Sequence, residues 1–170
     1  MSPASAPISA LTGAAGEHFV MSQLLRQGLI AALAPQGAPN LDIIVSSVSG
    51  HQQFGIQVKS RRGAGSDGGW HMRPKHCDLA EPGLYYCFVN FEVGSASLPE
   101  TYVIPSEKVA KVLTETHKAW LSRPGKNGHI RKDNPVRRLL PDYSYAYAPD
   151  KPKFARGWLD PYREAWSYFE

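Results

Sequence analysis

Two short segments, Leu41-Asp42-Ile43-Ile44-Val45 and Phe54-Gly55-Ile56-Gln57-Val58-Lys59, decide how this chain folds. Successive side chains of a strand point to opposite faces. The apolar residues at 41, 43 and 45 therefore share one face of the first segment, and Asp42 points to the other. In the second segment the apolar residues at 54, 56 and 58 oppose Gln57 and Lys59. With the turn-prone Ser47-Val48-Ser49-Gly50 between strands over 40–46 and 53–60, the pattern predicts a β-hairpin in which Asp42 meets Gln57 and Lys59.

A helix is predicted over residues 13–27, between the N-cap Thr12 and the stop signal Gly28. Apolar residues follow Glu17 at spacings of three, four and seven, so Glu17 projects from the apolar face of this helix. A carboxylate directed toward a core is costly unless it meets a cation or several hydrogen-bond donors. The alternative is that Glu17 lies at the edge of this face and reaches water.

The remaining elements predict one α/β domain, with a mixed central β-sheet flanked by helices. Two further strands are expected, and then a helix that begins at Ser106. No internal repeat or domain boundary is evident. The expected segments are a tail over 1–11, a single domain over 12–170, strands over 84–93 and 101–105, a helix over 106–121, an irregular basic and aromatic segment over 122–157, and a closing helix within 158–170.

Length and composition exclude several classes of protein. A chain of 170 residues that is 42% hydrophobic and 20% charged has the size and composition of one globular domain. No run approaches the 18 or so apolar residues that a membrane span needs, and the N-terminal segment does not resemble a secretory signal. Two cysteines cannot form a disulfide scaffold. A cytoplasmic location and no membrane partner are expected.

The net charge of +4 is concentrated in two stretches. Residues 59–78 hold five basic and two acidic residues, and residues 123–138 hold six basic and one acidic residue. Such clustering is typical of an anion-binding surface, although solvated loops would give the same pattern. The tyrosines that follow the second stretch suit either base stacking or cover of the sheet edge.

A Glu on the first helix, an Asp on a strand and Gln-x-Lys on the next strand together resemble the PD-(D/E)XK nuclease superfamily, which has the restriction-endonuclease-like fold. The matching residues are Glu17, Asp42 and Gln57-Val58-Lys59. The pattern is most similar to the Holliday-junction resolvase-like and type IV restriction-enzyme-like members, several of which carry Gln-x-Lys. The resemblance covers residues 13–62.

The resemblance implies a metal-dependent hydrolysis of phosphodiester bonds. Asp42, Glu17, Gln57 and the backbone carbonyl of Val58 would bind Mg²⁺, or Mn²⁺ as a substitute, since these ions prefer oxygen ligands. Lys59 would position the attacking water or stabilise charge in the transition state. Gln57 stands where an acidic residue is more common, which favours a mechanism with one metal ion.

Phosphate contacts are expected from basic residues of the two positive stretches. These are Arg61, Arg62, Arg73, Lys75, Lys126, Arg131, Lys132, Arg137 and Arg138.

Other motifs point elsewhere but lack their structural context. Gly63-Ala64-Gly65-Ser66-Asp67-Gly68 matches a dinucleotide-binding fingerprint, yet no helical pattern follows it, and a loop beside the hairpin is the better interpretation. His71, His76 and Cys77 offer too few neighbouring ligands for a typical zinc site.

The sequence therefore predicts a Mg²⁺-dependent DNA endonuclease. The alternative is a catalytically inactive module that keeps the nuclease fold and binds nucleic acid or protein. DNA is the expected partner, RNA is a second possibility, and the chain could form a homodimer. A domain with no role in nucleic-acid binding is a third hypothesis.

Overall fold

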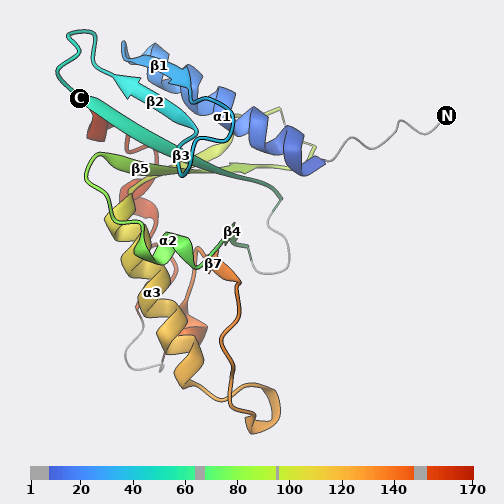
Figure 1. The fold of residues 1–170 in the computed structure, drawn as a ribbon. Helices are drawn as coiled ribbons and strands as arrows, with labels where there is room; N and C mark the ends of the chain where they lie inside the picture. The colour runs from blue at the N-terminus through green and yellow to red at the C-terminus, as the bar shows by residue number, and fades with distance from the viewer. Residues whose placement is uncertain (1–7, 64–67, 95, 148–152) are drawn as a thin grey trace.

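A computed structural model describes residues 8–63, 68–94, 96–147 and 153–170 of the chain (Figure 1). Its centre is a mixed five-stranded sheet with the order β1-β2-β3-β5-β6. Only the pair β3–β5 is parallel, and the other neighbours are antiparallel. The strands are β1 (Ile30–Leu33), β2 (Ile43–Ser46), β3 (Gln53–Arg62), β5 (Leu84–Phe91) and β6 (Glu100–Pro105).

The predicted hairpin is confirmed. β2 pairs with β3 so that Ile43 lies opposite Ile56 and Val45 opposite Phe54. This register follows from burial, because a shift by one residue would move every apolar side chain to the wrong face. β3 is ten residues long and β2 only four, so the second half of β3 extends past the end of β2.

Helices cover both faces of the sheet, as the α/β prediction requires (Figure 1). α1 (Ile8–Arg26) packs on one face, where Val20 and Leu24 are buried together with Ile43, Ile56 and their neighbours. α3 (Ser106–Ser122) lies on the opposite side, where Val109 and Leu113 join a second core cluster.

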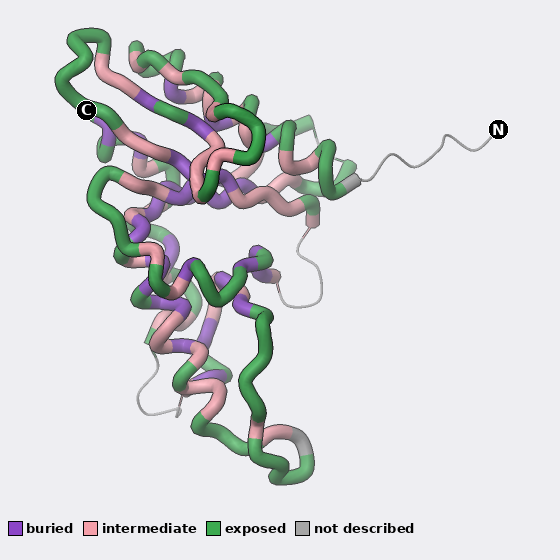
Figure 2. Tube along the Cα trace, viewed as in Figure 1, coloured by how far each residue is buried: buried purple, intermediate pink, exposed green. Residues whose placement is uncertain are grey.

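A small two-stranded sheet completes the second layer. β4 (Trp70–Met72) pairs antiparallel with β7 (Arg137–Leu139), and the one-turn helix α2 (Lys75–Asp78) follows β4. Buried Trp70 and Met72 join these elements to the core on the α3 side, and Figure 2 shows the buried stretches of the chain meeting there. The segment predicted as irregular over 122–157 begins with the last residue of α3, and its other described residues (123–147 and 153–157) contain one strand and the 3-10 turns Lys126–Gly128 and Ser144–Ala146.

Besides β4, α2 and β7, which were not expected, the chain differs from the sequence-based expectation at α1, at β1 and at the C-terminus. α1 begins at Ile8, before the expected cap Thr12, so the expected tail over 1–11 loses its last four residues to the helix. Ala10 and Leu11 favour helix, and nothing in this stretch stops one. β1 was not expected, because its Ile-Ala-Ala-Leu sequence shows no alternation.

The third difference lies at the C-terminus, where 3-10 turns over Asp160–Tyr162 and Trp166–Phe169 replace the expected closing helix. The chain between these turns pairs with the sheet instead. Arg163 forms a β-bridge with Tyr102, and the backbone N–H of Glu164 donates to the carbonyl of Thr101 at 3.0 Å. A continuous helix would lose these bonds to the edge strand β6.

Ser106 begins α3 as expected but does not cap it. Its buried hydroxyl donates to the carbonyl of Glu81 and accepts from the N–H of the same residue, each at 2.9 Å. Ser106 therefore ties the start of α3 to the loop between α2 and β5. Within the described residues, neither α1 nor any other helix combines the length and apolar character needed to cross a bilayer.

Candidate functional site

Asp42 lies where β2 begins and β3 continues alone. Its carboxylate Oδ2 accepts a hydrogen bond of 2.7 Å from the backbone N–H of Val58. Its own N–H donates to the carbonyl of Ile56 at 2.9 Å. Asp42 thus continues the pairing of β2 with β3 beyond the start of β2. Its backbone bonds to Ile56, and its side chain bonds to Val58. This places the carboxylate at the open edge of β3.

The backbone groups of Val58 face the same edge. The N–H groups of Gly55 and Gly63 point to the opposite side and donate to Gly83 and Phe91 at 2.9 and 2.8 Å. Even-numbered residues of β3 therefore direct both N–H and C=O toward β2. Because β2 starts only after Asp42, it does not cover Val58, and the Val58 carbonyl lies on a free edge of β3 beside Asp42.

Gln57 is adjacent and buried, with 5% of its surface exposed. Its Oε1 atom is buried and has no hydrogen-bond partner among the described residues. A buried polar atom without a partner costs about 1–3 kcal/mol. An oxygen held in this way suits a bound cation or water, so the arrangement fits the expected role of Gln57 as a metal ligand.

Glu17 reaches this region because α1 approaches β3 closely at Gly16. A Cβ atom at Gly16 would overlap the hydroxyl of Ser60 on β3. Partial burial raises the pKa of Glu17, and the charge of Asp42 raises it further, whereas His18 and Lys59 act in the opposite direction. The two carboxylates and Lys59 are therefore close enough to influence one another electrostatically.

Lys59 lies on the same face of β3 as Gln57, which the alternation of the strand predicted. Burial lowers the pKa of its ammonium group. Asp42 and Glu17 raise this pKa, while Lys75 and Arg73 lower it. Lys59 thus lies between the acidic cluster and a group of cations.

Those cations line a cleft on the α3 side of the sheet, with a volume of about 550 Å³. Lys59 lines it from β3, and the other lining residues come from β4, the turn between β4 and α2, α2 itself and the chain before β7. They are His71, Met72, Arg73, Lys75, His76, Pro135 and Val136. This basic cleft (Lys59 and these seven residues) adjoins the cluster of Glu17 and Asp42.

His76 entered the sequence analysis only as a member of an incomplete zinc site, and the structure places it in the basic cleft. It is 2% exposed, and its Nδ1 atom lies 2.8 Å from the hydroxyl of Tyr86. Burial lowers the pKa of His76 to about 4, and the nearby cations Lys59, Lys75 and Arg73 add to this effect. His76 is therefore neutral at pH 7.

The predicted phosphate contacts separate into two groups. Arg73 and Lys75 are exposed and line the basic cleft. Arg138 lies opposite His71 in the β4–β7 pair, with Nη1 at 2.8 Å from Nε2 of that ring. Arg62 is exposed at the end of β3.

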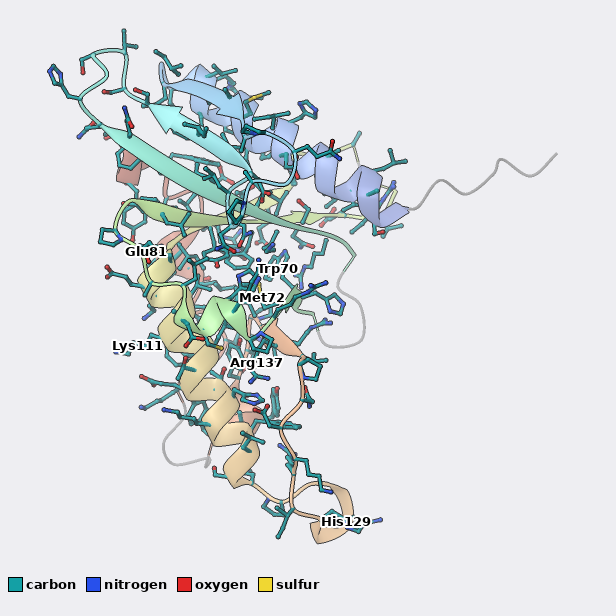
Figure 3. All side chains as sticks on the ribbon, viewed as in Figure 1. Trp70, Met72, Glu81, Lys111, His129 and Arg137 are labelled. Atoms are coloured by element: carbon teal, nitrogen blue, oxygen red, sulfur yellow. The ribbon has the colours of Figure 1, made fainter. Side chains whose placement is uncertain are left out.

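Other predicted contacts are engaged inside the protein or lie far from the cleft. The guanidinium of Arg61 lies 3.9 Å from the ring centre of Trp70 and donates to Asn90. Arg137 is 8% exposed and donates to the carbonyls of Asn134 and Val136. Arg131 covers the ring of Trp120, and Lys132 is exposed. Figure 3 shows His129, three residues before Lys132 in the sequence, beyond the end of α3 that is farther from the sheet. The side chain of Lys126 lies outside the described part of the chain, as does most of the Gly-rich loop (64–67).

The donor set of the candidate site consists of oxygen atoms. Among the described residues, no three His, Cys, Asp or Glu side chains gather closely enough to hold a metal ion by themselves. The available donors are the carboxylates of Asp42 and Glu17, the amide oxygen of Gln57 and the carbonyl of Val58. Hard oxygen donors with few carboxylates suit Mg²⁺, which usually keeps several waters.

Comparison of the sequence with protein-family models and with curated proteins gives no match. Among solved structures, the fold is similar to that of a bacterial homing endonuclease, I-Ssp6803I. The TM-score is 0.51 and the sequence identity 14%, over 94% of this chain and 89% of that chain. At this identity the likeness concerns the fold alone. The chain therefore has a nuclease-like α/β fold.

Proposed function

We propose that this protein is a Mg²⁺-dependent DNA endonuclease of the PD-(D/E)XK type. The observation that carries the proposal is the juxtaposition of Asp42, held by the Val58 N–H, with the buried, unpartnered oxygen of Gln57. The similarity of the fold to a homing endonuclease supports the same class of activity.

In the proposed reaction, water attacks the phosphorus of a DNA phosphodiester and the bond to one ester oxygen breaks. Asp42, Glu17, Gln57 and the Val58 carbonyl would hold Mg²⁺, which when bound polarises the phosphoryl oxygen and lowers the pKa of a coordinated water. The Lys59 ammonium would orient the attacking water or stabilise the charge that develops on the phosphoryl oxygens. Its position between Asp42 and the basic cleft suits either role.

Cleavage of supercoiled plasmid DNA with Mg²⁺ or Mn²⁺ tests the proposal. Asp42→Asn and Lys59→Met should each lower the rate at least about 100-fold, whereas Lys111→Gln on the outer face of α3 should leave it unchanged. Cleavage that survives either substitution in the site would overturn the assignment.

The presence of only two carboxylates favours one alternative, an inactive nuclease fold that binds DNA through the basic cleft. This protein would bind DNA in a salt-dependent way and would not cleave it with either metal. Asp42→Asn would then leave the affinity for DNA unchanged.

A further inference from the structure

The basic cleft is lined by side chains of one charge sign. Lys59 projects from β3, Lys75 from α2 and Arg73 from the turn between β4 and α2, and no carboxylate is among the lining residues. We infer that this cleft is a second phosphate subsite, which binds the backbone phosphate next to the one cleaved beside Lys59. The inference rests on the proposed function only in saying which phosphate is cleaved.

Two cations of the cleft, Arg73 and Lys75, have no acidic partner among the described residues. The Arg73 guanidinium forms no hydrogen bond or ion pair with the part of the chain that the structure describes, while its backbone carbonyl accepts from the N–H of His76. The ammonium of Lys75 donates to a neutral acceptor, Oδ1 of Asn40, at 2.8 Å. Like charges gathered in this way repel one another, and an anion placed between them would remove that repulsion. The vacant hydrogen-bond donors of Arg73 match the oxygens of a phosphate.

The positive charge of the cleft also affects His76. Lys75 and Arg73 both lower the pKa of His76, in addition to the larger effect of burial. The buried, neutral imidazole of His76 adds no positive charge to the cleft. Its bond to Tyr86 connects α2 with β5 of the central sheet. The subsite is therefore built on packed elements.

The cleft also continues toward the proposed metal ligands. The bond from Lys75 to Asn40 joins α2 to the loop that ends at Asp42, and Lys59 lines the cleft from the other side. A strand whose phosphate lies between Arg73 and Lys75 would thus place its next phosphate near Lys59 and Asp42. Figure 3 shows Met72 and Arg137 from β4 and β7 side by side on the α3 side of the sheet.

The test measures DNA binding without cleavage. Full-length protein in EDTA is titrated into a fluorescein-labelled duplex, and the association constant is followed by anisotropy between about 50 and 200 mM salt. Each phosphate contact contributes about 0.9 to the slope of log K against log[salt]. The double variant Arg73→Gln/Lys75→Gln removes both contacts to this one phosphate and should therefore lose about 0.9 from this slope, and Arg73→Gln alone should lose part of that amount.

Two controls separate charge from structure. Arg73→Lys keeps the cation and should retain most of the wild-type slope. Arg26→Gln/Lys111→Gln removes two exposed cations outside the cleft and should leave the slope unchanged. An unchanged slope in Arg73→Gln/Lys75→Gln, with a wild-type circular dichroism spectrum, overturns the subsite.

The subsite and the proposed function fail separately. If the slope falls as expected but no metal supports cleavage, the subsite stands and the endonuclease proposal is wrong. If cleavage depends on Asp42 and Lys59 but the slope is unchanged, the endonuclease proposal stands and the subsite is wrong.

Discussion

The carboxylate of Asp42 accepts a 2.7 Å hydrogen bond from the backbone N–H of Val58, at the point where β3 extends beyond β2. The side chain thus takes the place of a strand partner that the chain does not supply. One residue consequently has two roles, because it completes the sheet and also places a negative charge beside Gln57.

These two roles predict a separation between stability and activity at Asp42. Asp42→Ala leaves the Val58 N–H without its acceptor and should lower the free energy of unfolding by about 1–3 kcal/mol. Asp42→Asn keeps an acceptor oxygen and should cost less, while it removes the charge that metal binding needs. Urea unfolding and plasmid cleavage should show both variants inactive and only Asp42→Ala clearly destabilised. Equal destabilisation would contradict the structural role.

Gly16 is predicted to control the approach of α1 to β3. Gly16→Ala would force a Cβ against Ser60 and should cost about 1–3 kcal/mol despite the better helix propensity of Ala. Gly13→Ala in the same helix meets no atom within 4 Å and should stabilise the protein by about 0.5–1 kcal/mol. Thermal unfolding of the two variants provides the comparison. A stabilising Gly16→Ala would show that this contact is not tight.

Gln57 is predicted to tune metal binding. Gln57→Glu adds a third carboxylate at a buried position next to Asp42, so the metal-free protein should melt at a lower temperature than wild type. Added Mn²⁺ should then raise the melting temperature of Gln57→Glu more than that of wild type, because a ligand that binds only the folded state stabilises it. Gln57→Leu should lose the response to Mn²⁺. A similar Mn²⁺ response in all three proteins would exclude Gln57 as a ligand.

His76 is predicted to make stability depend on pH. Its pKa in the folded protein is about 4, whereas an unfolded histidine titrates near 6.5. Between these values the unfolded chain binds a proton that the folded protein does not. The free energy of unfolding should therefore fall as the pH decreases from 6.5 to 4, by up to about 3 kcal/mol. His76→Gln should show a shallower fall in urea titrations across this range, and the exposed His51→Gln should behave as wild type.

Arg137 is predicted to act in folding, because its Nη1 and Nη2 atoms donate to the chain just before β7 and its Nε atom is buried. Its guanidinium also contacts Asp133 at 3.2 Å, besides the two backbone carbonyls. Arg137→Gln should lower the free energy of unfolding by about 1.5–3 kcal/mol. Its salt slope in DNA binding should stay at the wild-type value. A reduced slope without loss of stability would show that Arg137 contacts phosphate instead.

The pairing of β2 with β3 and the shared face of Gln57 and Lys59 could be predicted because both follow from a period of two in local sequence. Helix α1 was predicted for a similar reason, although its first residues carried no boundary signal. The 3-10 turns at the C-terminus could not be predicted, because they depend on bonds between Glu164 and the distant strand β6. Likewise, the sequence of Arg137 and Arg138 does not reveal which of the two guanidinium groups is buried.

The sequence by itself determined the α/β class and the hairpin and provided the residues proposed for the site, since apolar periodicity and side-chain type are local properties. Tertiary structure alone decided the rest. In the folded protein β2 starts just after Asp42, so that the Asp42 carboxylate accepts the N–H of Val58. Gly16 of α1 lies against Ser60 of β3, which brings Glu17 toward the proposed site. β4 and α2 line the cleft next to Lys59. These are contacts between residues far apart in the chain, and they depend on how the buried faces pack together.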